Sequence, residues 1–171
     1  MDFLELAKER FSVRNYTDQQ IEQEKLDKIL EAARIAPTAA NNQPQRIYVL
    51  QGEEAIAKIR SITRCAFNAP TVLLIGYDEN EDWKNALEDG IHSGEEDASI
   101  VATHIMLEAW NLGIGSCWVN VFPNTDTAKA FSLPESVKLV LVMPMGYAAE
   151  NAKPAPKHAN KKEIQDFVQV L

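Results

Sequence analysis

The stretch Pro70-Thr71-Val72-Leu73-Leu74-Ile75-Gly76-Tyr77 decides the fold of this chain. It is a continuous, uncharged and mainly apolar run of strand length, which is typical of a central β-strand that is buried on both faces. A second, mainly apolar run covers residues 138–147, and residues 46–50 form a third strand candidate. These runs predict a sheet with helices packed on it.

Helical periodicity flanks the strand candidates. Between residues 21 and 35 the apolar side chains recur at i, i+3, i+4 and i+7, which predicts a helix with one buried stripe: Leu26, Ile29, Leu30 and Ala33. Thr17-Asp18-Gln19-Gln20 before it resembles a capping box. Further helices are expected near residues 3–9, over 53–63 and over 124–131, the last one capped by Asn124 or Thr125.

The expected helix over residues 98–112 is apolar nearly all round, so it should be buried nearly all round. A domain of this size has little room for such a helix, and part of its surface is expected to lie against another subunit. Gly113-Ile114-Gly115-Ser116 ends the helix, and a short strand is expected over 117–122. The turns lack phosphate-loop glycines, so an α+β fold with a central mixed or antiparallel sheet fits better than a doubly wound one.

Size and composition indicate one globular domain, residues 1–171. The formal charge of −8 and the pI near 4.9 argue against nucleic acid and anionic membranes as partners. No apolar run is long enough to span a membrane, and the acidic first residues do not resemble a secretion signal. Cys65 and Cys117 are too few for a secreted disulfide framework, so a cytoplasmic location is expected.

Two segments are expected at the surface. Residues 78–97 are strongly acidic and are interpreted as a solvated segment around a short helix at 83–87. The tail from Ala148 is expected to be extended because of Pro154 and Pro156, and to carry Lys157 toward an anion. Apolar residues after position 161 predict a last amphipathic turn or two.

The loop Ala36-Pro37-Thr38-Ala39-Ala40-Asn41-Asn42-Gln43-Pro44-Gln45 is rich in small and amide side chains. Its donors and acceptors suit the edge of a planar ring that is rich in heteroatoms, and its alanines leave room for a flat molecule. Asn, Pro and Thr are also common turn residues, so an ordinary polar loop is the alternative.

Arg10, Ser12 and Arg14 form the densest basic cluster in the first third of the chain. Two guanidinium groups with a hydroxyl between them can hold a phosphate through charge-assisted hydrogen bonds. A solvated basic turn is the alternative. No metal site is expected, because the three histidines are scattered, and Cys117 is expected to be an inert core thiol. No side chain is predicted to act as a catalytic acid, base or nucleophile.

Taken in order, these motifs resemble the FMN-dependent nitroreductase family in its short, single-domain form. The resemblance is carried by the segments 10–16, 33–44, 112–118 and 144–147 and by Asp97: Arg-Phe-Ser-Val-Arg-Asn-Tyr, Ala-Arg-Ile-Ala-Pro-Thr-Ala-Ala-Asn-Asn-Gln-Pro, Leu-Gly-Ile-Gly-Ser-Cys-Trp and Pro-Met-Gly-Tyr. It spans nearly the whole chain in order and spacing. Two departures are Ala148, where the family often has proline, and Lys157, where it often has arginine.

The resemblance implies a nitroreductase-like α+β fold and an intertwined homodimer, with the tail 148–171 on the partner subunit and FMN between the subunits. Arg10, Ser12, Arg14 and Lys157 would hold the phosphate and ribityl end, and Trp118, Val119 and Asn120 would lie along the isoalloxazine ring. The partner subunit would supply the loop residues Pro37, Thr38, Ala39 and Asn41, and Gln43 would lie close by.

The implied activity is that of an oxidoreductase. NADH or NADPH would reduce the flavin, which would then reduce a small acceptor such as a nitro compound or a quinone by a ping-pong mechanism. Two alternatives stay open: another reductive flavin reaction on the same fold, such as dehalogenation, and a flavin-binding or regulatory protein without turnover.

Overall fold

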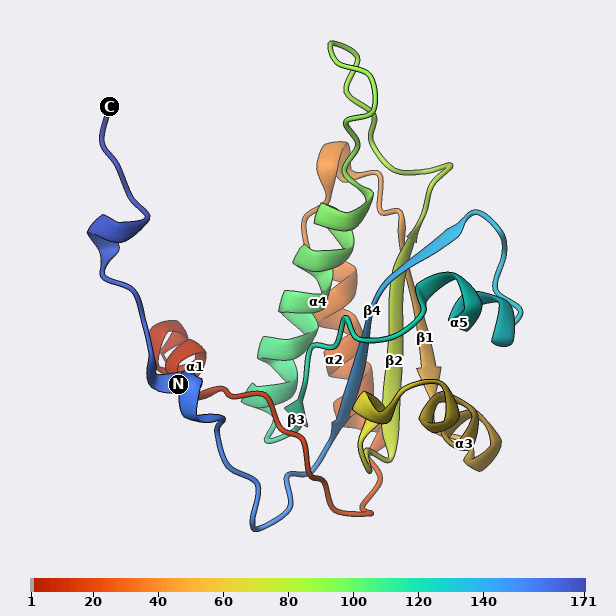
Figure 1. The fold of residues 1–171 in the computed structure, drawn as a ribbon, viewed down its shortest axis with the longest axis vertical. Helices are drawn as coiled ribbons and strands as arrows, with labels where there is room; N and C mark the ends of the chain where they lie inside the picture. The colour runs from red at the N-terminus through yellow and green to blue at the C-terminus, as the bar shows by residue number, and fades with distance from the viewer. Residues whose placement is uncertain (1) are drawn as a thin grey trace.

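The computed structural model describes residues 2–171 and shows an antiparallel sheet between two helical layers (Figure 1). Its strands, in the spatial order β1-β2-β4-β3, are β1 (Gln45–Leu50), β2 (Thr71–Asp78), β4 (Val137–Gly146) and β3 (Gly115–Ser116). The α-helices are α1 (Phe3–Glu9), α2 (Gln23–Ile35), α3 (Glu53–Ile62), α4 (Gly94–Asn111) and α5 (Asn124–Ala130). The short 3₁₀ turns are η1 (Ala39–Asn41), η2 (Arg64–Ala66), η3 (Pro156–Ala159) and η4 (Ile164–Asp166).

The central strand β2 divides the core into two halves. Leu73 and Ile75 face α2 and α4, whereas Val72 and Leu74 face the layer of α3 and α5 (Figure 1). All four side chains are fully buried, which confirms the sequence prediction of a strand buried on both faces. The α+β class is confirmed as well, and the sheet is antiparallel throughout.

The stripe predicted for α2 is confirmed, because Leu26, Ile29 and Ala33 are buried and the fourth member, Leu30, is partly buried against the same core. The predicted start of this helix is wrong. The helix begins at Gln23, and its N-cap residue Glu22 makes no capping hydrogen bond through its side chain. The backbone N–H of Thr17 donates to the carbonyl of Tyr147 at 2.9 Å. The chain therefore stays extended beside the end of β4, too far from the helix to cap it.

The helix expected at residues 83–87 is absent from the described chain. Residues 84–92 form a hairpin instead, with a bridge between Lys84 and His92. The side chain of Asp82 is fully buried at its base, paired with Lys84 and with His92 Nδ1 at 2.8 Å. Most of the acidic segment is exposed, as predicted, but Asp82 is buried, because its contact with His92 joins positions ten residues apart and favours the hairpin over a local helix. Helix α4 also begins four residues earlier than expected, at Gly94.

The strand expected over residues 117–122 is mostly wrong. β3 contains only Gly115–Ser116, and one further bridge joins Val119 to Val142. Side chains occupy the next carbonyls of β4: Asn120 Nδ2 donates to Val140 at 3.0 Å and Asn124 Nδ2 to Leu139 at 2.8 Å. Asn124 therefore does not cap α5, which begins without a side-chain cap.

The tail beyond Ala148 runs beside α1 and away from the body (Figure 1). Its predicted final turn is only the 3₁₀ turn η4, where Ile164 and Phe167 are exposed by 70% and 67%. None of the helices described between residues 2 and 171 has the length and apolarity needed to cross a membrane.

Candidate functional site

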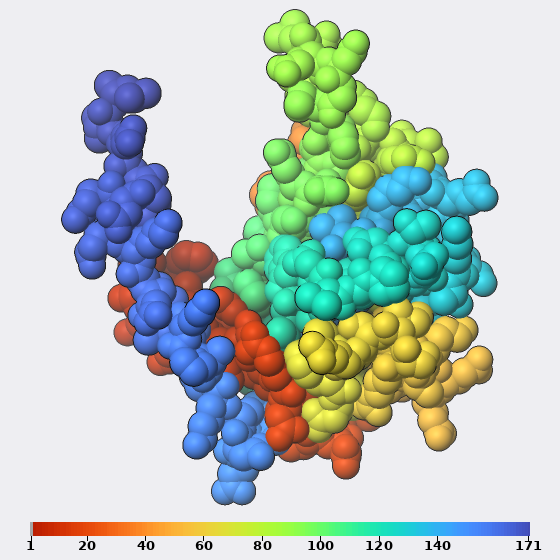
Figure 2. Space-filling view, viewed as in Figure 1, coloured from red at the N-terminus to blue at the C-terminus, as the bar shows by residue number. Residues whose placement is uncertain are grey.

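The segment that follows α1 is joined to β3. Ser12 and Ser116 form a parallel bridge, and the backbone N–H of Val13 donates to the carbonyl of Ser116 at 3.0 Å. Figure 2 shows residues 10–16 between the tail and the segment that follows β3. Two motifs that lie far apart in the sequence are thereby placed side by side.

The two arginines of this segment have no acidic partner within the part of the chain that the structure describes. Arg14 is exposed, and its Nη1 donates to the carbonyl of Ser12 at 3.0 Å. Within residues 2–171 neither Arg10 nor Arg14 forms an ion pair with a carboxylate. In a chain with a formal charge of −8, two guanidinium groups in one short segment, without a carboxylate partner among the described residues, are suited to an anionic ligand.

The buried thiol of Cys117 lies beneath the same cluster. Burial raises its pKa, while the positive charges of Arg14 and Arg10 and a hydrogen bond with Ser12 act in the opposite direction. The thiol is therefore protonated at neutral pH and poorly reactive, as the sequence predicted for a core cysteine.

The segment after β3 forms a fixed edge beside the arginines. The backbone N–H groups of Cys117 and Val119 donate to β4, whereas those of the alternating residues Trp118 and Asn120 donate to no backbone carbonyl within residues 2–171. The Trp118 indole N–H donates to Asn120 Oδ1 at 2.8 Å. This edge therefore combines a held indole with backbone donors that remain available to a ligand.

Lys157 lies near the basic segment because the next residue, His158, contacts Phe11. The ring of His158 in η3 lies 6.4 Å from that of Phe11, which itself packs edge-on against Trp110 of α4 at 5.2 Å. Lys157 is exposed and forms no ion pair within the described chain. The structure thus places Arg10, Ser12 and Arg14 beside the segment that contains Trp118, Val119 and Asn120, and Lys157 lies in η3 next to the residue that contacts Phe11.

The other five predicted residues lie at the opposite end of α4: Pro37, Thr38, Ala39, Asn41 and Gln43. The Ala39 N–H donates to Asp97 Oδ1 at 2.8 Å in the first turns of α4, whereas Trp110 contacts the basic segment in its last turn. Asp97 and Trp110 are thirteen helical positions apart, which corresponds to about 20 Å along the helix axis. One protomer therefore does not bring the two halves of the predicted site together.

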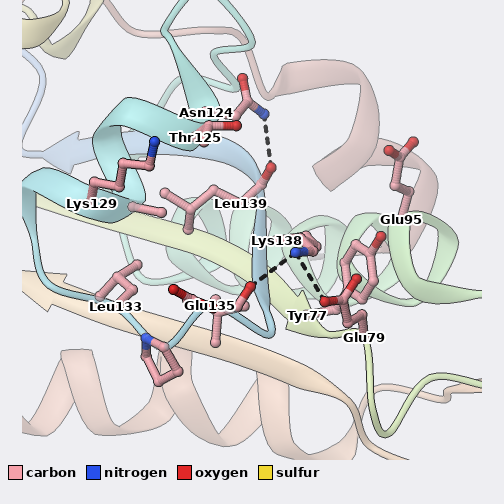
Figure 3. Close-up of a pocket in the computed structure, with 13 residues that line it drawn as sticks. Tyr77, Glu79, Glu95, Asn124, Thr125, Lys129, Leu133, Glu135, Lys138 and Leu139 are labelled. Atoms are coloured by element: carbon pink, nitrogen blue, oxygen red, sulfur yellow. Dashed lines mark hydrogen bonds and ion pairs between the residues drawn. The ribbon is translucent and has the colours of Figure 1, made fainter.

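A cavity of about 530 Å³ lies elsewhere, between α5 and the start of β4 (Figure 3). Tyr77 and Lys129 line it, and Lys138 crosses it to pair with Glu79 at 3.0 Å. It contains none of the predicted site residues. The sequence carried no signal for it, because its walls come from three stretches that lie apart in the chain: residues 77–79, Glu95 and residues 124–139. No cluster of three or more metal-ligating side chains occurs among residues 2–171.

The sequence and the fold match known proteins. The nitroreductase family profile matches residues 7–67 and 60–147. A Methanothermobacter thermautotrophicus protein, provisionally named NADH dehydrogenase/NAD(P)H nitroreductase, is 34% identical over 88% of this chain and 80% of its own length. The FMN reductase [NAD(P)H] of Bacillus subtilis is 27% identical over 85% of this chain and 66% of its own.

The crystal structure of a nitroreductase family protein from Clostridium difficile 630 superimposes with a TM-score of 0.91 at 38% sequence identity, covering 99% of this chain and 98% of that one. The match extends over the whole architecture described above, including the sheet and the long central helix. Fold, motif order and sequence profile therefore agree, and the chain belongs to the nitroreductase family.

Proposed function

We propose that the protein is an FMN-dependent NAD(P)H oxidoreductase whose single domain, residues 1–171, binds the flavin at the interface of a homodimer. The unpaired Arg10 and Arg14 beside the 117–120 edge carry this proposal. Family membership supports it, and so does the NAD(P)H-linked activity named for the two relatives.

The donor set fits the phosphate end of FMN. Two guanidinium groups can supply paired N–H donors to phosphate oxygens, and Ser12 adds a hydroxyl. Lys157 adds a charge without the planar fork of an arginine. The 117–120 edge offers backbone N–H groups and an indole, which suit the polar rim and the face of a planar ring.

A second protomer would complete this site. A twofold axis near the middle of α4 would place the 37–43 loop of one copy against the basic segment of the other. Ile100, near the middle of this helix, is 38% exposed in the single chain, which supports a contact there. The exposed tail 148–171 and the free edge of β1 also offer surfaces that a partner can cover.

The chain supplies binding and orientation rather than acid–base groups, and no catalytic side chain is proposed. Bound FMN would accept a hydride from NADH or NADPH and pass the electrons to a nitro compound, quinone or similar acceptor by a ping-pong mechanism. The Trp118–Asn120 hydrogen bond would hold one wall of the pocket, and Arg10 and Arg14 would anchor the phosphate. The proposal includes a cytoplasmic location, consistent with two free cysteines.

The test begins with the colour of the purified protein. We expect a yellow protein, or a colourless one that quenches flavin fluorescence stoichiometrically when FMN is added. A protein that does neither overturns the proposal. Stopped-flow mixing of the FMN-loaded protein with NADH and NADPH in turn would measure flavin bleaching, and steady NAD(P)H oxidation with a quinone would distinguish an enzyme from a binding protein without turnover.

A further inference from the structure

Asp97 is a buried carboxylate without a cationic partner. Only 1% of the surface of Asp97 is exposed to solvent, and no Lys, Arg or His within residues 2–171 pairs with it. Oδ1 accepts the Ala39 N–H at 2.8 Å, and Oδ2 accepts the Ser93 hydroxyl at 2.7 Å. Burial of a carboxylate costs folding free energy unless its oxygens accept hydrogen bonds. The two bonds that satisfy Asp97 also hold the segments of Ala39 and Ser93 against α4.

The segment fixed by Oδ1 is a strained loop. Ala40, Asn41 and Gln43 all have positive φ angles, of 51°, 57° and 54°. Such conformations are uncommon for residues other than glycine and persist only where the surroundings hold them. The bond from Ala39 to Asp97 ties the start of this loop to the rigid helix α4.

The other oxygen of Asp97 reaches the acidic hairpin through Ser93. Ser93 is 2% exposed, and its Oγ accepts the N–H of Trp83 at 3.1 Å while it donates to Asp97. The Ser93 N–H in turn donates to the carbonyl of Trp83 at 3.0 Å. The Trp83 N–H thus donates to the Ser93 hydroxyl, and that hydroxyl donates to Asp97. This series of hydrogen bonds starts in the hairpin and fixes the orientation of the Asp97 carboxylate.

One side chain of the loop remains available for a ligand. The Asn41 carboxamide is exposed and makes no hydrogen bond within residues 2–171, whereas hydrogen bonds hold the loop on both sides of it. We infer that Asp97, oriented by Ser93, is a positioning residue that fixes the 38–43 loop and so aims Asn41 at the flavin. This inference rests on the proposed function for its ligand, but its geometry can be tested without one.

The first experiment measures amide hydrogen exchange by NMR in the protein without flavin. We expect the Ala39 N–H to be protected in the wild type and unprotected in Asp97→Ala. In Asp97→Asn the remaining carbonyl oxygen can still accept, so protection should persist with an upfield amide shift. The Leu74 N–H in the centre of β2 is the internal reference, because general destabilisation would speed exchange there as well.

The second experiment measures FMN affinity by fluorescence quenching. Because Asp97→Ala removes a hydrogen bond that holds the loop with Asn41, we expect the FMN Kd to rise by up to about tenfold, the effect of about one hydrogen bond. The rise should be smaller in Asp97→Asn and Ser93→Ala. Glu96→Ala is the matched control, since Glu96 lies one residue earlier in α4, is exposed, and its side chain makes no hydrogen bond within the described chain.

The outcomes separate the two proposals. A wild type that binds no FMN overturns the proposed function, while the exchange data still report on the role of Asp97. Loss of Ala39 protection with an unchanged Kd overturns the present inference alone, as does an equal effect of Glu96→Ala. If Asp97→Ala does not fold, Asp97→Asn and Ser93→Ala decide by the same two measurements.

Discussion

Gly115 in β3 lies directly against Val13: a Cβ added at Gly115 would be 2.5 Å from Val13 Cγ2. The fully buried Val13 is the residue through which the basic segment docks on the sheet. The absence of a side chain at Gly115 thus sets how closely Arg10 and Arg14 approach the 117–120 edge.

Gly115→Val is expected to displace the basic segment. The added atoms overpack a tight contact, which costs about 1–3 kcal/mol of unfolding free energy, and the FMN affinity should fall because the arginines move. Thermal unfolding and flavin titration measure the two effects. Gly52→Ala is the control, since a Cβ there meets nothing within 4 Å. Unchanged FMN binding in Gly115→Val would show that the docking of Val13 does not position the arginines.

Removal of one guanidinium group should weaken flavin binding selectively. A hydrogen bond to a charged group contributes about 1.5–3 kcal/mol, so Arg14→Ala should raise the FMN Kd by about tenfold or more. Stability should change little, because Arg14 is exposed. Arg34→Ala is the matched control, since it removes an exposed arginine paired with Glu31 at 2.5 Å, away from the basic segment. Equal FMN affinities of the two variants would contradict the assignment.

The stability of the protein is expected to fall in alkaline solution. Burial raises the pKa values of Tyr16 and Cys117, so the folded state keeps protons that an unfolded chain releases from about pH 9 upward. Their stabilising effect is complete at neutral pH and is lost as the pH rises, by up to about 1.4 kcal/mol per pH unit for each group.

Thermal unfolding between pH 7 and pH 11 tests this dependence. Tyr16→Phe should lower the melting temperature at pH 7, because the hydroxyl donates to the carbonyl of Val13 at 2.6 Å. The melting temperature of the same variant should fall less steeply above pH 9 than that of the wild type. Part of the slope will remain, since burial raises the pKa of Tyr77 as well. If the melting temperatures of the wild type and of Tyr16→Phe fall in parallel with pH, Tyr16 does not contribute to the loss of stability in alkaline solution.

Shortening of the tail should weaken the proposed dimer. Ile164, Phe167 and Val168 are exposed in the single chain, and burial of apolar surface contributes about 25 cal/mol per Å². A variant that ends at Asn160 keeps Lys157 but lacks these side chains, so its monomer fraction should rise at low concentration. Light scattering after size exclusion measures this fraction. Leu87→Ser, at an exposed hairpin tip, is the comparison variant. A full-length chain that is monomeric at every concentration would contradict the two-subunit site.

The sequence by itself determined the elements whose pattern is local. The apolar runs of β2 and β4 and the stripe of α2 predicted buried strands and an amphipathic helix, because side-chain periodicity reports directly on which faces are buried. The motif order likewise predicted the family, and the cluster of Arg10 and Arg14 was visible in the primary structure.

Only the tertiary structure decided the features that depend on distant partners. Asp82 and Asp97 look like solvated acids in the sequence but are buried, because His92, Ser93 and Ala39 reach them through the fold. Asn120 looks like a strand residue, yet its side chain shortens β3 by occupying a carbonyl of β4. The helix α4 likewise holds the two halves of the predicted site apart in one protomer. The physical reason is that a hydrogen bond or an ion pair depends on distance in space, which local sequence patterns do not encode.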